Sequence, residues 1–226
     1  MNKRIWFAVS VLLLAALACS FGGSDNGATD TTGPSDTTNT EVDSSILFSD
    51  DFSSTGSGWD RTSSSFGDTD YQDGGYHIFV SDEYSSVWAN PGRNFTDVRV
   101  EVNGHKIGGV DDNEFGAICR YQDESNFYAG SISSDGYYAI IMIRDGEFGY
   151  LGADAMMPSD AIRQGSSTNA IRLDCVGSTL TLYANGTQLV SVSDTNFASG
   201  DVGLYAGTFG TPGIDILFDD FVVRRP

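Results

Sequence analysis

Short β-strands separated by turn residues dominate this chain, and residues 114–152 show the pattern most clearly. Four strand-like runs follow one another there, at residues 115–121, 127–133, 137–144 and 147–151. In the third run both alternating sets are apolar: Ile141 belongs to one set and Ile140 to the other. A strand that is apolar on both faces usually lies inside a sheet with material packed on each side. The pattern predicts an antiparallel sheet with this stretch at its centre.

Two turn dipeptides set the register of expected hairpins, Asp145-Gly146 and Asn185-Gly186. Both favour two-residue turns, because the central positions of such turns need positive φ. The first turn places Ile143 opposite Phe148. The second places Leu182 opposite Leu189, so that leucine meets leucine on one face of the sheet.

Residues 46–226 are predicted to form one all-β domain, an antiparallel two-sheet β-sandwich of the jelly-roll type. Further strands are expected at residues 46–52, 76–81, 86–89, 98–107, 170–176, 179–184, 188–192, 202–208 and 214–223. Helical periodicity is nearly absent, and a single helical turn is expected at residues 158–162. About 180 residues is an ordinary size for one such domain.

Residues 1–19 form a targeting segment: Lys3 and Arg4 precede an almost entirely apolar run that ends in Ala16-Leu17-Ala18-Cys19. Small residues before a cysteine in this position resemble a bacterial lipoprotein signal, in which the peptide is cut before a cysteine that is then lipidated. The match departs at Ala16, where that family prefers Leu, and at Leu17, where it prefers a small residue. An ordinary secretory signal or an uncleaved anchor is the alternative.

The resemblance implies an exported protein that is lipid-anchored at Cys19 on the extracytoplasmic face of the cell membrane. Residues 20–45 are rich in Ser, Thr, Gly, Asp and Asn and cannot bury enough surface to offset their ordering entropy. We interpret them as a flexible tether with an end-to-end distance on the order of 25–30 Å. The alternative is that this segment folds back as an edge strand.

The charge of the chain is strongly acidic, with 12 Lys+Arg against 31 Asp+Glu and a formal net charge of −19. Such a surface repels nucleic acid and anionic lipid headgroups. We therefore expect no nucleic-acid partner, and contact with the bilayer only through the anchor. Cations or neutral ligands are favoured.

Three cysteines are present, and lipidation of Cys19 would leave Cys119 and Cys175. Two remaining cysteines in an exported protein tend to pair. Each lies in phase with apolar neighbours in its strand, so both are expected to point inward and to form a disulfide. Two buried free thiols are the alternative.

No motif assigns catalysis, a metal or a cofactor. The two histidines lack zinc-site spacing, and G-x-S-x-G, a Walker loop and the E-x-D-x-x-E signature of jelly-roll glucanases do not occur. Residues 111–122 resemble an EF-hand loop but have Gln122 where a bidentate glutamate is needed. An irregular calcium site remains open, with Asp50-Asp51 and Asp219-Asp220 as the pairs of interest.

Aromatic side chains are the most informative candidates for ligand binding, because sugar rings stack on aromatic rings. We expect an outward-facing set, flanked by two arginines, to line a groove: Trp88, Arg120, Tyr121, Tyr128, Tyr138 and Arg144. The alternative is that these aromatics belong to the core, since strands favour aromatic residues.

Four segments together resemble concanavalin A-like (laminin G-like) jelly rolls: Phe115–Tyr138, Asn169–Gly186, Phe197–Leu204 and Phe218–Val223. They are most similar to the branch found in bacterial lipoproteins and in domains related to 3-keto-disaccharide hydrolases. The resemblance implies carbohydrate binding or hydrolysis, with a minority of protein-binding members. No catalytic residue of the hydrolase branch matches this sequence position by position.

Three functions follow as hypotheses. The first is a surface-tethered carbohydrate-binding module, with a glycan as partner. The second is an extracytoplasmic module that docks an envelope protein. The third is a glycoside-active enzyme of the 3-keto-disaccharide hydrolase type, which requires two carboxylates in one groove.

Overall fold

The computed structural model describes residues 43–226. The expected signal segment, residues 1–19 with Cys19, and the tether up to residue 42 lie outside the described residues. Within 43–226, no helix is long and apolar enough to cross a membrane.

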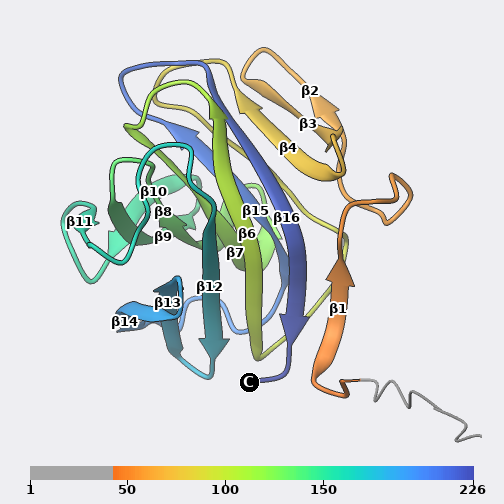
Figure 1. The fold of residues 1–226 in the computed structure, drawn as a ribbon. Helices are drawn as coiled ribbons and strands as arrows, with labels where there is room; N and C mark the ends of the chain where they lie inside the picture. Colours follow the sequence, from red (N-terminus) through yellow and green to blue (C-terminus); the bar gives the residue numbers. More distant parts are fainter. Residues whose placement is uncertain (1–42) are drawn as a thin grey trace, which may run out of the picture. The chain divides into compact units, whose positions relative to one another are not determined.

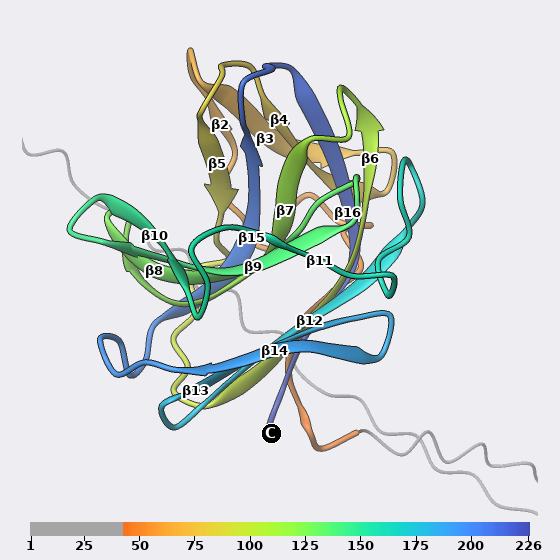
Figure 2. The ribbon, with the colours of Figure 1, turned by 90° about the vertical axis from the view of Figure 1, so that its left-hand side faces the viewer.

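Two antiparallel sheets lie face to face, as the sequence pattern predicts (Figures 1 and 2). Sheet A contains β1 (Ile46–Asp50), β2 (Thr62–Ser63), β3 (Gly67–Gln72), β4 (Gly75–Val80), β6 (Val98–Gly108), β12 (Asn169–Val176), β13 (Thr179–Ala184), β14 (Thr187–Ser193) and β16 (Ile214–Arg224). Sheet B contains β5 (Ser86–Ala89), β7 (Asn113–Asp123), β8 (Asn126–Ile132), β9 (Tyr137–Arg144), β10 (Glu147–Leu151), β11 (Met157–Pro158) and β15 (Asp201–Thr208).

The order of strands brings distant parts of the chain side by side. Sheet A runs β14-β13-β12-β6-β16-β4-β3-β2, with β1 paired to the second half of β16. Sheet B runs β10-β9-β8-β7-β15-β5, with β11 paired to β9 beside β10. The C-terminal strand β16 is therefore central in sheet A, between β6 and β4.

The core lies between the sheets, where each strand presents one alternating set of apolar side chains. Val100 and Leu173 from sheet A and Ala117 and Ile140 from sheet B are each at most 1 % exposed. Burial of such side chains is the main favourable contribution to folding, about 1.5–3 kcal/mol for each large one.

A disulfide joins the two layers. Cys119 on β7 and Cys175 on β12 are bonded, with their Cα atoms 6.7 Å apart and both side chains fully buried. Both residues thus point inward, on the phases that the sequence indicates.

The strand pattern was predicted almost completely, but three short strands were not: β2, β3 and β11. The helical turn expected at residues 158–162 is wrong: Pro158 ends β11, and the following residues form a non-helical turn. β9 is covered on both faces, as its pattern indicates, but it lies next to the edge strand β10 and not at the centre of sheet B.

The two hairpin registers had different outcomes. Ile143 pairs with Phe148 across the Asp145-Gly146 turn, as predicted. Leu182 pairs with Val190 and not with Leu189, because a β-bulge follows Leu182 and shifts the register by one residue. Turn chemistry fixes the loop, but it does not reveal an irregularity inside the strands.

Candidate functional site

The outward side of sheet B is apolar, although the outer face of an antiparallel sheet is commonly polar. Six of its side chains are buried: Ile118, Phe127, Ala129, Ala139, Ile141 and Tyr205. Five partly buried side chains pack around them: Trp88, Tyr121, Ile143, Tyr150 and Met156. We call these eleven residues the aromatic face. It forms a second apolar cluster, separate from the core between the sheets.

Trp88 and Tyr121 form the part of the aromatic face that the sequence predicted. The indole Nε1 of Trp88 donates a hydrogen bond to the Tyr121 hydroxyl at 3.4 Å. Both rings pack on Phe127, with centroid distances of 5.3 Å and 5.5 Å. Because both are only partly buried, each ring leaves some surface open to a ligand.

Tyr121 reaches this face because the backbone of β7 is irregular at Arg120. Arg120 has φ 55°, in the left-handed region, and pairing between β7 and β8 is interrupted between Cys119 and Asp123. Strict alternation would place Tyr121 on the inner side with Cys119. The bulge instead directs it outward.

Arg120 itself is not a groove residue, and the expectation that it flanks the ligand is wrong. The residue is 2 % exposed, and its guanidinium donates hydrogen bonds to the backbone carbonyls of Phe197 at 2.9 Å and Gly177 at 2.7 Å. It also lies 3.3 Å from a carboxylate oxygen of Asp97. Its donors therefore hold three loops together.

Tyr128 and Tyr138 were expected to face outward, and this is wrong. Tyr128 is fully buried in the core between the sheets, and its hydroxyl bonds to Asp194. Tyr138 also packs against that core and is half-buried. In each strand the opposite phase forms the aromatic face, which the sequence could not distinguish because both phases are apolar.

Arg144 is not part of the aromatic face. Its side chain is exposed at the end of β9 and donates a hydrogen bond to the side chain of Asn196 at 3.0 Å. Of the six predicted ligand residues, only Trp88 and Tyr121 belong to the aromatic face.

Glu114 is a buried carboxyl on the outward side of sheet B. It is 3 % exposed, and its Oε1 accepts a hydrogen bond from the Tyr205 hydroxyl at 2.6 Å. That hydroxyl also lies 2.7 Å from the Ser86 Oγ. Desolvation raises the pKa of Glu114 to about 7, and burial raises the pKa of Tyr205 well above its ordinary value.

Two polar atoms on this side of sheet B are buried and have no hydrogen-bond partner within residues 43–226. They are the second carboxyl oxygen of Glu114 and the Oγ of Ser131. Buried polar groups are nearly always hydrogen-bonded, so such atoms need an explanation.

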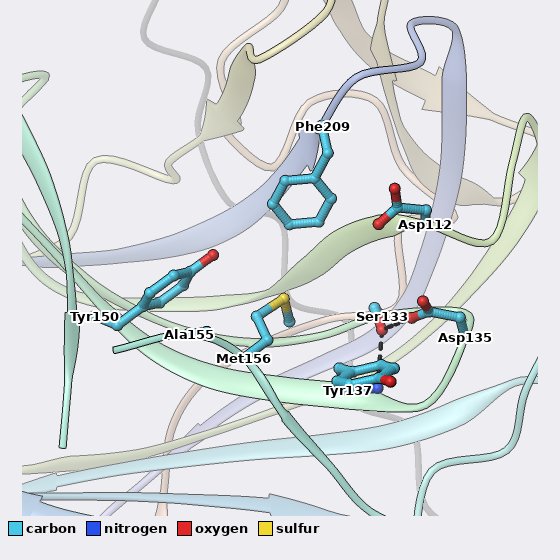
Figure 3. Close-up of a pocket in the computed structure, with 8 residues that line it drawn as sticks. All are labelled: Asp112, Ser133, Asp135, Tyr137, Tyr150, Ala155, Met156 and Phe209. Atoms are coloured by element: carbon cyan, nitrogen blue, oxygen red, sulfur yellow. Dashed lines mark hydrogen bonds between the residues drawn. The ribbon is translucent and has the colours of Figure 1, made fainter. Parts of the chain in front are cut away.

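A pocket of about 290 Å³ opens on the same side of sheet B (Figure 3). It is lined by Asp112, Ser133, Asp135, Tyr137, Tyr150, Ala155, Met156 and Phe209. The Ser133 hydroxyl bonds to the Asp135 carboxylate and accepts a hydrogen bond from the Tyr137 backbone N–H at 2.9 Å. The pocket thus combines carboxylates, phenols and apolar side chains.

Glu114 lies below this pocket. Phe115 pairs with Ile132, so the preceding Glu114 lies beside Ser133, which lines the pocket. Burial, together with the charge of Glu114, raises the pKa of Tyr150, which lines the pocket, to about 12. The aromatic face and the pocket are therefore parts of one continuous surface.

Sequence reasoning missed Glu114, Tyr205 and the two pocket aspartates. The strand was expected to begin at Phe115, whereas β7 begins at Asn113 and buries Glu114. One signal was available: Glu114 is in phase with Gly116 and Ile118, so it is a charged residue on an apolar face.

The acidic pairs named for a calcium site form no such cluster. Among residues 43–226, no group of three His, Cys, Asp or Glu side chains is placed to hold a metal ion. The Asp50 carboxylate instead accepts hydrogen bonds from the Trp59 Nε1 and the Phe52 backbone N–H, each at 2.9 Å.

Neither a known family model nor a curated protein matches the sequence. The fold, by contrast, is similar to solved structures. The carbohydrate-binding module CBM66 from Bacillus subtilis has a TM-score of 0.60 at 13% identity, over 74% of this chain and 96% of that one. The Bacillus licheniformis beta-glucanase has a TM-score of 0.58 at 10% identity, over 79% and 97%.

A Bacillus subtilis protein of unknown function with a galectin-like fold has a TM-score of 0.56 at 12% identity, over 80% of this chain and 96% of that one. The fold is a concanavalin A/galectin-like jelly roll. At such low identity the likeness establishes the fold alone, in agreement with the resemblance inferred from the sequence.

Proposed function

We propose that the protein binds carbohydrate on the aromatic face of sheet B. The observation that carries this proposal is the pair of partly exposed, hydrogen-bonded rings of Trp88 and Tyr121 on a rigid sheet, continuous with a polar pocket. Aromatic rings offer flat apolar surface to sugar C–H groups, while carboxylates and phenols accept or donate hydrogen bonds to hydroxyls. Neighbours of the same fold include a carbohydrate-binding module and a beta-glucanase, which supports the proposal.

Replacing Trp88 and Tyr121 together with Ala tests this proposal on a panel of neutral and charged polysaccharides, by affinity electrophoresis. We expect wild-type protein to be retarded by at least one glycan and the double variant to lose at least about tenfold in affinity, since stacking aromatics dominate such contacts. Arg144→Ala, at a predicted ligand residue that is not part of the aromatic face and bonds to Asn196, is the control and should bind like wild type. Binding that survives in the double variant would place the ligand elsewhere.

We propose further that the protein is exported and tethered to the extracytoplasmic face of the cell membrane through a lipid on Cys19. The motif at residues 16–19 and the polar segment that follows support this. In cells, a block of lipoprotein processing should leave a longer precursor, and Cys19→Ser should release or mislocalise the protein. Membrane retention of a normally processed Cys19→Ser protein would contradict the anchor.

A further inference from the structure

The pocket at one end of the aromatic face has an unusual charge composition for a sugar site. Its two charged lining residues are Asp112 and Asp135, and no Lys, Arg or His of residues 43–226 lines it. The two carboxylates therefore have no basic partner in the pocket.

The remaining lining side chains suit an organic ammonium ion and not a metal ion. Tyr137, Tyr150 and Phe209 surround the opening with aromatic rings, and the Tyr137 ring is 39 % exposed (Figure 3). The negative faces of aromatic rings attract ammonium groups at short range. Metal ions such as calcium need several oxygen ligands held around one point, and these residues form no metal-ligand cluster.

Glu114 adds a buried polar group beneath this end of the aromatic face. Its Oε1 accepts the hydrogen bond from Tyr205, whereas its Oε2 and the Ser131 Oγ are buried and have no partner within residues 43–226. A ligand with several N–H donors matches the carboxylates of Asp112 and Asp135 that line the pocket, whereas an anion would be repelled by them.

We propose that this pocket takes a protonated primary amino group on a sugar ring, so that the protein selects glycans that carry free amino sugars. The sugar ring would extend from the pocket along the aromatic face toward Tyr121 and Trp88. This inference rests on the proposed carbohydrate binding and names its ligand class. The formal net charge of −19 favours the same class, because it attracts polycationic glycans and repels acidic ones.

Three oligosaccharides of equal length and the same β-1,4-linked glucose backbone test the inference, because they differ only at C2, which carries an amino, an acetamido or a hydroxyl group. Affinities are measured by isothermal titration calorimetry at pH 5.5 in low and high salt. We expect the amino form to bind about tenfold more tightly than the hydroxyl form, since two exposed charge pairs contribute a factor of this order. That preference should shrink at high salt.

Variants of the two pocket aspartates test whether the preference for the amino form arises in the pocket. Asp112→Asn with Asp135→Asn should bring the amino and hydroxyl forms to within about twofold of each other, without loss of the hydroxyl form. Asp73→Asn is the control for a loss of acidic charge as such: Asp73 lies in the β3–β4 turn of sheet A, and this change removes one negative charge at a position outside the pocket.

Several results would overturn the inference. Equal binding of the amino and hydroxyl forms would do so, as would a preference that survives in the Asp112/Asp135 double variant. Competition by spermidine as strong as that by the amino oligosaccharide would show that a polyamine, not a sugar, supplies the ammonium group. Failure of all three oligosaccharides to bind also overturns it, and the Trp88/Tyr121 comparison on the wider panel then decides carbohydrate binding separately.

Discussion

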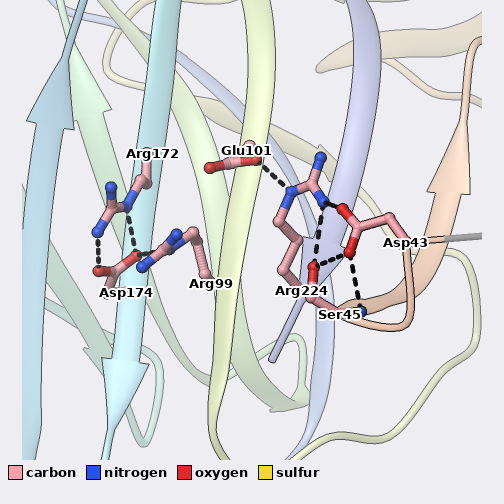
Figure 4. A network of polar contacts seen from close by, with 7 residues as sticks. All are labelled: Asp43, Ser45, Arg99, Glu101, Arg172, Asp174 and Arg224. Carbon is pink, nitrogen blue, oxygen red and sulfur yellow. Dashed lines mark hydrogen bonds and ion pairs between the residues drawn. The ribbon is translucent and has the colours of Figure 1, made fainter. Parts of the chain in front are cut away.

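The two outer faces of the sandwich differ in the side chains that they carry. The outer face of sheet A carries paired charges: Arg172 contacts Asp174 at 2.6 Å, and Arg224 contacts Glu101 at 2.9 Å (Figure 4). The outer face of sheet B carries the aromatic face, and its one central acid, Glu114, has no basic partner. Both sheets are antiparallel, and both have apolar inner sides.

The charges on sheet A remain in contact with water, since the side chains of Arg172 and Arg224 are 30% and 26% exposed. Exposed ion pairs contribute little to stability, typically about 0–1 kcal/mol. Glu114 on sheet B is removed from water, and an ionised carboxyl is costly in such a buried place. The difference indicates that sheet A has an ordinary solvated face, whereas sheet B keeps groups that folding alone does not require.

The largest expected effect on stability comes from the disulfide, which joins sheet B at Cys119 to sheet A at Cys175. Replacing Cys119 and Cys175 with Ala should lower the free energy of unfolding by about 4 kcal/mol in the chain-entropy model, for a sequence separation of 56 residues. Urea unfolding of the double variant and of wild type measures this loss.

Reductant provides the control for that prediction. Wild type in excess reductant should unfold like the double variant, and the double variant should not respond to reductant. Two alkylatable thiols in unreduced, denatured wild type would show that no bond forms in the mature protein.

The next largest effect on stability is expected from Glu114, the buried carboxyl by which the outer face of sheet B differs from that of sheet A. Its pKa of about 7, against an ordinary 4.5, means that folding favours the neutral form, so stability present below pH 4.5 is lost as pH rises to 7. The loss amounts to about 3 kcal/mol. In Glu114→Gln this part of the pH dependence should disappear, and urea unfolding at pH 4.5, 6 and 7.5 tests it.

The matched control is Glu124→Gln, an exposed residue in the β7–β8 turn, which should retain the wild-type pH dependence. If wild type and Glu114→Gln lose stability in parallel between pH 4.5 and 7.5, Glu114 is ionised in the fold, and the contrast between the faces fails.

Most of the fold could be predicted from the sequence, because strand alternation and turn residues act locally. The Asp145-Gly146 register was correct for this reason. The bulges at Leu182 and Arg120 were not predictable, because each depends on what the strand meets after the sheets pack. Arg120 shows this well, since its left-handed backbone is held by contacts to loops distant in the sequence.

The site was only partly predictable. Trp88 and Tyr121 were chosen as aromatics in strands, but the same reasoning selected Tyr128, which lies in the core. When both phases of a strand are apolar, composition cannot tell the inner from the outer set. The packing of the two sheets decides which set of side chains is on the outer face. On β7, for example, Cys119 is bonded to Cys175 of the opposite sheet, so its side chain is on the inner face.

A smaller effect is expected from Tyr205→Phe, which removes the hydroxyl between Glu114 and Ser86. Both groups lose their partner, so stability should fall by about 2 kcal/mol, and the pKa of Glu114 should rise further because that hydrogen bond lowers it. Tyr150→Phe is the control, since its phenol is half-buried and should cost much less. Equal losses in chemical denaturation would mean that the Glu114–Tyr205 bond has no special importance.

The smallest effect is expected on sheet A, from Arg224→Gln. Arg224 joins Glu101 on β6 to Asp43 and Ser45 before β1, and its side chain is partly in water. Its loss should cost less than about 1 kcal/mol, and less still in 1 M salt, because exposed pairs are screened. Arg225→Gln, the neighbouring exposed arginine, controls for net charge. If Arg224→Gln instead cost as much as loss of the disulfide at any salt concentration, the polar face would be a structural clamp on the first strand, and the division between a solvated face and a functional face would have to be abandoned.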